Sequence, residues 1–153
     1  MKDLKKFLKL VRKSHNYKKQ GQSLLQEDPQ SYNQLLNFLV VMESNLHWEN
    51  KTNYIKLIEN FLNHQLKADD FSIIFCNKYE KVNREVKQLN HELDSLKISK
   101  LLITNEKSYD FSKKLTELYS LCDNFDLFQV SRIKKKNQIN SFHHDVKKIA
   151  QNL

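Results

Sequence analysis

The chain has 153 residues, of which 39% are hydrophobic and 29% charged, and its formal net charge at pH 7 is +8. This length suits one hydrophobic core, and the composition is that of a globular protein rather than a disordered one. One glycine and one proline are too few for the tight hairpin turns of a β-rich fold. The sequence therefore predicts an all-α domain.

The residue usage also bears on origin and compartment. Lysine, asparagine and isoleucine are abundant while glycine and proline are scarce, a bias typical of an AT-rich genome such as that of a plastid, mitochondrion or plasmid. Cys76 and Cys122 lie far apart and form no CxxC motif, so neither a zinc ribbon nor a thioredoxin-type motif is present. No apolar run reaches the roughly 18 residues of a membrane span. We expect a cytoplasmic or organellar protein in a reduced compartment.

The N-terminal third shows two helical patterns. From Leu4, apolar residues recur at i, i+3, i+4 and i+7 among lysines, which predicts an amphipathic basic helix over residues 2–14. Asp28 followed by Pro29 is a helix-start signal, and it predicts a second helix that runs to about residue 46. The residues expected to be buried on this second helix are Tyr32, Leu35, Leu36, Leu39, Val40 and Val41.

The middle of the chain carries the clearest stripes. A third helix is predicted from residue 52 or 53 to about residue 64, and a fourth begins at residue 67 or 68. Within the fourth, apolar residues alternate in steps of four and three from Phe75 to Leu96, the period of a left-handed packing seam. The seam predicts a long bundle helix, with a coiled-coil homodimer through residues 75–96 as the alternative.

The C-terminal part repeats this pattern once. Steps of four and three between Phe111 and Phe125 predict a fifth helix over roughly residues 108–126. A charged linker is expected at residues 131–136, followed by a last helix that begins at residue 140 or 141.

These elements predict an antiparallel helical bundle of five or six helices. Its expected organisation is a basic N-terminal helical extension, residues 1–50, packed on a helical bundle formed by residues 51–153.

The sequence contains no catalytic motif. One glycine cannot build a phosphate-cradling loop, and no serine lies in a G-x-S-x-G elbow. His143 and His144 are adjacent, so a helix would point them about 100° apart, a poor arrangement for a shared metal. His47, His64 and His91 lie near predicted helix ends or polar faces, where capping or solvation is the simple interpretation. We expect no enzymatic activity, no cofactor and no metal.

Positive charge is concentrated at the two ends of the chain. Residues 1–58, 59–126 and 127–153 carry net charges of +5, −2 and +5. Basic ends can neutralise nucleic-acid phosphates, so a basic RNA-binding accessory protein is one functional hypothesis. A solvated lysine-rich surface and attachment of the first helix to a membrane interface are the alternatives. The residues that would carry RNA binding are Lys5, Lys6, Lys9, Arg12, Arg132, Lys134, Lys135 and Lys136.

Four stretches carry a further pattern: a helical stripe at residues 54–62, an acidic helix start at 66–71, a helix with an acidic end at 115–126, and a short helix at 141–153. In this order they resemble the colicin-D-type, self-protective bacteriocin immunity family, small helical proteins that bind and block a toxin nuclease. Residues 1–50 have no counterpart in the family pattern.

The resemblance implies a non-catalytic protein that inhibits or sequesters a protein partner, a toxin nuclease in that family, through an acidic surface that mimics nucleic acid. The partner-binding residues that it implies here are Glu59, Asp69, Asp70, Asp123 and Asp126.

Overall fold

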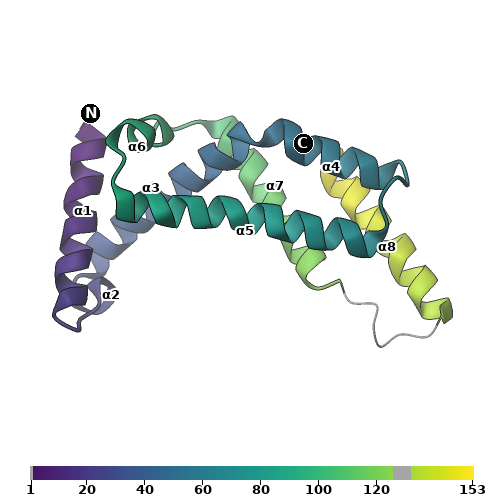
Figure 1. Cartoon of the computed structure of the whole chain (residues 1–153), viewed down its shortest axis with the longest axis horizontal. Helices are drawn as coiled ribbons and strands as arrows, with labels where there is room; N and C mark the ends of the chain where they lie inside the picture. The colour runs from purple at the N-terminus through teal and green to yellow at the C-terminus, as the bar shows by residue number, and fades with distance from the viewer. Residues whose placement is uncertain (1, 126–131) are drawn as a thin grey trace. The chain divides into compact units, whose positions relative to one another are not determined.

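The computed structural model describes residues 2–125 and 132–153 of the chain. These residues contain eight helices and no strand, so the all-α prediction is confirmed (Figure 1). The helices are α1 (Lys2–Lys19), α2 (Leu24–Glu27), α3 (Pro29–Glu49), α4 (Lys51–Leu62), α5 (Ala68–Glu92), α6 (Ser95–Leu101), α7 (Glu106–Asp123) and α8 (Arg132–Ala150). The number exceeds the predicted five or six because α2 and α6, with 4 and 7 residues, are too short to show a helical period.

The chain divides into two compact units. Unit 1 comprises Met1–Leu46 and Asn83–Tyr109, and unit 2 comprises His47–Val82 and Asp110–Leu153. The division therefore falls inside α3, α5 and α7. The domain boundary expected at residue 50 lies near the first crossing, but residues 83–109 group with the N-terminal segment rather than with the rest of 51–153. A helix that continues from one unit into the other shows no break in its sequence pattern. The sequence therefore contains no signal from which this division into units could be predicted.

In unit 1, α1 packs with its apolar stripe inward. Phe7, Leu10 and Val11 are buried, and α1 contacts α2 and α6 (Figure 1). The amide of Asn45 on α3 donates hydrogen bonds to the carbonyls of Leu101 and Ile103, both at 2.7 Å, which ties α3 to the end of α6. The interpretation of α1 as a membrane-interface helix is therefore wrong, because its apolar side is already occupied.

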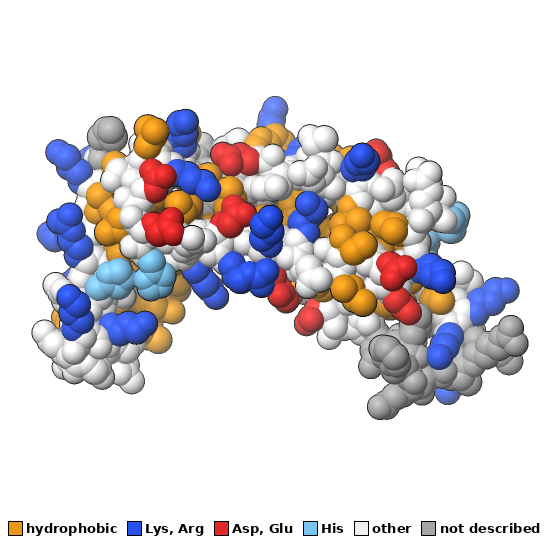
Figure 2. Space-filling model, viewed as in Figure 1, with side chains coloured by type: hydrophobic (Ala, Val, Ile, Leu, Met, Phe, Trp, Pro, Cys, Tyr) orange, Lys and Arg blue, Asp and Glu red, His pale blue; other side chains and the backbone are white. Residues whose placement is uncertain are grey.

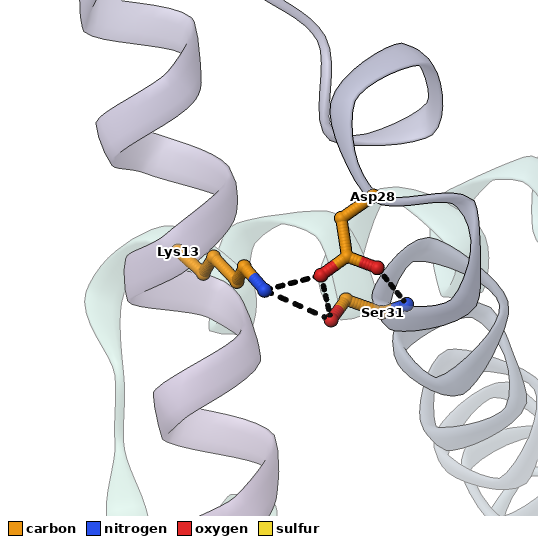
Figure 3. Close-up of polar contacts among 3 residues, drawn as sticks. All are labelled: Lys13, Asp28 and Ser31. Carbon is orange, nitrogen blue, oxygen red and sulfur yellow. Dashed lines mark hydrogen bonds and ion pairs between the residues drawn. The ribbon is translucent and has the colours of Figure 1, made fainter.

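The start of α3 is held by a charged cap (Figure 3). The Asp28 carboxylate accepts hydrogen bonds from the Ser31 amide at 3.0 Å and the Ser31 hydroxyl at 2.7 Å, as an N-cap residue does. Lys13 of α1 forms an ion pair with the same carboxylate, and this contact holds the pKa of Asp28 well below its usual range. The predicted helix start at Asp28 and Pro29 is confirmed.

The core of unit 2 is built from aromatic rings. Figure 1 shows α5 turning back along α4, and the rings of Phe61 and Phe71 stack between the two helices with centroids 4.4 Å apart. Phe142 brings α8 onto this pair, with its ring 5.5 Å from Phe61 and 4.2 Å from Phe125. The other buried members of the cluster are Tyr54, Leu57, Ile58, Ala68, Phe75, Phe111, Leu115, Leu118, Cys122 and Val146.

The seam of α5 packs within the chain. Its members Phe75, Val82, Val86 and Leu89 are buried, which agrees with the bundle interpretation. The helix ends at Glu92, earlier than the predicted pattern, and Leu96 lies on α6 with 71% of its surface exposed. A homodimer through residues 75–96 would require the buried part of this seam to be free, so that prediction is corrected.

Three further predictions are wrong. On α3, Leu36 and Val40 are 39% and 44% exposed, whereas Met42 is buried. His47 is buried rather than solvated: its Nδ1 lies 3.0 Å from the Tyr54 hydroxyl. The charged segment from residue 132 to residue 136 is the first turn of α8 and not a linker, because lysine and arginine favour helices even without an apolar stripe.

None of the helices within residues 2–125 and 132–153 combines the length and the apolar character needed to cross a membrane.

Candidate functional site

Four of the five acidic residues predicted to bind a partner lie in unit 2, exposed to solvent. Glu59 lies on α4, Asp69 and Asp70 occupy the first turn of α5, and Asp123 is the last residue of α7. Asp126 lies outside the described residues. Helix geometry decides which of the four share a surface.

One side of α5 combines acidic and apolar side chains. Asp69, Ile73, Cys76 and Glu80 follow one another at steps of four, three and four residues, so they lie on the same side of the helix. Ile73 is 61% exposed and its neighbour Ile74 is 42% exposed. Figure 2 shows hydrophobic and acidic side chains side by side near the start of α5. Large apolar residues on a long helix ordinarily face the core. Their exposure here therefore indicates a candidate interaction surface.

Asp123 of α7 joins this side of α5. The Tyr119 hydroxyl donates a hydrogen bond to the Glu80 carboxylate at 3.0 Å, which links the two helices and raises the pKa of Tyr119 to about 12. Burial raises the pKa of Cys76 to about 11, and the nearby charges of Asp123 and Glu80 add to that increase. The carboxylates of Glu80 and Asp123 thus lie near Cys76. Cys76 itself lies one helical turn beyond Ile73. We call this surface the acidic face; its members are Asp69, Asp70, Ile73, Ile74, Glu80 and Asp123.

The helix dipole stabilises some of these carboxylates and destabilises another. Asp69 and Asp70 lie in the first turn of α5, where negative charge stabilises the positive end of the helix dipole. Asp123 lies at the C-terminal end of α7, where the dipole disfavours negative charge. Its carboxylate makes no hydrogen bond or ion pair to another residue that the structure describes. Helix stability therefore gives no reason for a carboxylate at this position.

Glu59 lies apart from the acidic face. It lines an open groove between α4 and the C-terminal end of the chain, where Lys147 is also present. The remaining lining residues of that groove are Ile55, Ile58, Leu62, Ala150, Gln151 and Leu153. Of the four described candidates, Asp69 and Asp70 are adjacent in the first turn of α5, and Asp123 of α7 lies near Cys76, about two turns further along α5.

A larger open groove of about 1020 Å³ runs between α7 and α8. Its walls carry both signs of charge, with Lys114 and Glu117 from α7 and Asp145 and Lys148 from α8. It contains neither a histidine nor a cysteine among its lining residues.

The basic candidates fall into two separate sets. Lys5, Lys6, Lys9 and Arg12 are exposed on α1 in unit 1, and Figure 2 shows Lys and Arg side chains along that helix. The second set belongs to α8 in unit 2: Lys134 and Lys136 are exposed and Lys135 is half-buried, whereas Arg132 lies in the helix with its side chain not described.

Groups able to hold a metal or act as a nucleophile do not converge. No three His, Cys, Asp or Glu side chains among the described residues form a group that could bind a metal ion. His143 stacks on His64 with ring centroids 4.8 Å apart, and its Nε2 lies 3.2 Å from the Leu62 carbonyl. Burial raises the pKa of the Cys122 thiol well above its usual range, as expected of a core residue.

Sequence reasoning missed Ile73, Ile74 and Glu80. A signal for the two isoleucines was present, because both are apolar and neither belongs to the seam that begins at Phe75. A large apolar residue outside the packing stripe of a long helix indicates an exposed patch. The position of Glu80 beside Tyr119 required the packing of α5 against α7, which no local pattern contains.

The chain matches no family model, and no curated protein or solved structure is detectably similar to it.

Proposed function

We propose that the chain is a non-catalytic interaction protein that binds a basic protein partner through the acidic face of unit 2. The observation that carries the proposal is Ile73, 61% exposed on the same side of α5 as Asp69 and Cys76, with Asp123 of α7 near Cys76. Exposed apolar side chains with carboxylates along the same helix side fit an interface that has an apolar centre and a charged rim.

The two kinds of side chain would contribute differently. Ile73 and Ile74 supply apolar surface that a partner can bury, and buried anchors dominate binding energy. The carboxylates attract a positively charged partner and fix its orientation, which raises the association rate and excludes acidic proteins. The partner class that fits is therefore a protein with an apolar pocket bordered by lysine or arginine.

A toxin nuclease is the partner class that the resemblance to immunity proteins implies. The surface with which a nuclease binds nucleic acid is basic, so an acidic face could occupy it and block substrate. The exposed Lys134 and Lys136 of α8 would repel such a surface. We therefore expect a basic partner to contact the α5 and α7 side of unit 2 and to avoid the start of α8.

The test is site-specific photo-crosslinking in cells that express the protein. A benzophenone amino acid replaces Asn77, which is exposed one turn beyond Ile73, so the isoleucine itself stays intact. A matched probe replaces Leu96, which is 71% exposed on α6. We expect a discrete adduct from the Asn77 position and none from the Leu96 position, with a basic protein in the adduct.

Purified partner then allows a charge-matched comparison. The pair Asp70→Asn with Asp123→Asn removes two charges from the acidic face, and Glu106→Gln with Glu117→Gln removes two exposed charges elsewhere on α7. The first pair and Ile73→Ser should each weaken binding at least tenfold, and the second pair should leave it unchanged. Equal effects of the two pairs, or an acidic partner in the adduct, would contradict the proposal.

A further inference from the structure

The outer side of α1 in unit 1 carries a cluster of positive charges. Lys5, Lys6, Lys9 and Arg12 are exposed on it, and we call these four residues the basic face of α1. None of their side chains makes a hydrogen bond or ion pair to any residue within the described part of the chain. Together with Lys13, Leu8 and Asn16, three of the four border a surface hollow. Four unpaired cations on one rigid helix form a preset positive surface.

The orientation of α1 is fixed from both sides. Its apolar side is buried through Phe7, Leu10 and Val11, so the helix cannot turn its lysines inward. Lys13 is the cation of α1 that has an acidic partner, and its ion pair with Asp28 attaches α1 to the start of α3 (Figure 3). The structure thus uses Lys13 for anchoring and leaves the basic face in solvent.

We propose that the basic face of α1 binds the phosphate backbone of a double-stranded nucleic acid, a function separate from the acidic face of unit 2. Lys5 and Arg12 are seven residues apart, which corresponds to about 10 Å along the helix axis. A duplex carries one negative charge per roughly 1.7 Å, so about six phosphate charges lie within that length. Counted over both strands, this number exceeds the four cations of the basic face.

Two other anionic ligands fit less well. Membrane attachment of an amphipathic helix needs an apolar side that enters the lipid, and the apolar side of α1 is buried in unit 1. An acidic protein could pair with the lysines, but the apolar residue among them, Leu8, is half-buried and offers only a small anchor. Regularly spaced cations without a large anchor are typical of backbone recognition, which carries no sequence information.

The test is fluorescence anisotropy of the full chain with a labelled RNA duplex and a DNA duplex of equal length, at salt concentrations of about 50 and 200 mM. Four phosphate contacts predict a slope of about −3.6 for log K against log salt, which corresponds to roughly a 150-fold loss of affinity over this range. Lys5→Gln with Lys9→Gln should leave two contacts and reduce the loss to roughly 12-fold.

Three controls make the result decisive. Lys56→Gln with Lys113→Gln changes the net charge equally through exposed residues of unit 2 and should keep the 150-fold loss. Lys5→Arg with Lys9→Arg should preserve binding, and circular dichroism should show that all variants stay folded. No binding to either duplex at 50 mM salt, an equal effect of both glutamine pairs, or displacement by polyglutamate at equal charge concentration would overturn the proposal.

Discussion

Replacement of Phe71 by alanine tests the aromatic core that positions the acidic face. The Phe71 ring is fully buried, stacks on Phe61 at 4.4 Å, and lies within 5.8 and 6.1 Å of Phe75 and Phe142. The loss of transfer free energy for the ring is about 2 kcal/mol. A residual cavity of about 100 Å³ costs about 2 kcal/mol more, so we expect a destabilisation of about 4 kcal/mol.

Trp48 provides the assay, because it is the one tryptophan of the chain and lies in unit 2 with its ring 5.6 Å from Phe111. Urea unfolding followed by its fluorescence should show the midpoint of Phe71→Ala about 2 M below that of the wild type, for a slope of about 2 kcal/mol per M. Phe71→Leu should lie between them, since leucine fills part of the cavity.

The matched control is Leu96→Ala, at a side chain that is 71% exposed. It should change the unfolding free energy by less than about 0.5 kcal/mol. If Phe71→Ala costs less than about 1 kcal/mol, or if it costs no more than Leu96→Ala, then Phe71 is not in the core and the reasoning about unit 2 fails.

Three smaller predictions follow from single contacts. Tyr54→Phe removes the buried hydrogen bond to His47 and should lower the unfolding free energy by about 1–2 kcal/mol in the same fluorescence assay; no change would show that the contact is unimportant. The pKa of Asp28 is lowered on folding, so its carboxylate stabilises the fold above the ordinary aspartate pKa of about 4 and loses this effect as the pH falls below it; the stability gap between wild type and Asp28→Asn should be largest at neutral pH and shrink in acid. Cys76, with its pKa raised to about 11, should react with iodoacetamide at pH 8 roughly two orders of magnitude more slowly than a free thiol of pKa about 8.5, and Cys122 should react more slowly still until the chain unfolds.

The helices that sequence predicts best are those with a unique apolar stripe and a polar start. α4 and the start of α5 agree with the prediction within two residues, and the start of α3 was predicted from Asp28 and Pro29. The burial pattern of α3 was not, because apolar residues cover all its sides between residues 35 and 42. Where every side of a helix is apolar, the hydrophobic period does not show which side is buried. Packing against other helices decides it, and Leu35 and Met42 are buried.

The candidate site was predictable only in part. Charge and helix ends pointed to Asp69, Asp70 and Asp123, but nothing local distinguished them from Glu59, which lies elsewhere on unit 2. What separates them is the packing of α7 against α5, a contact between residues about 40 apart in sequence, such as Tyr119 and Glu80. Long-range contacts of this kind leave no period and no spacing to detect.

Each unit is built from two separate segments of the chain, and this affects how the units can fold during synthesis. Unit 1 needs residues 83–109 in addition to its N-terminal part, so α1 and α2 emerge from a ribosome long before their remaining packing partners. Translation of the 63 residues from 47 to 109 takes about 3 to 13 s at 5–20 residues per second. During that interval α1 can pack on α2 and α3 but lacks its contact with α6. For the same reason, no single cut separates the two units: a fragment that ends at residue 109 contains all of unit 1 but also residues 47–82 of unit 2.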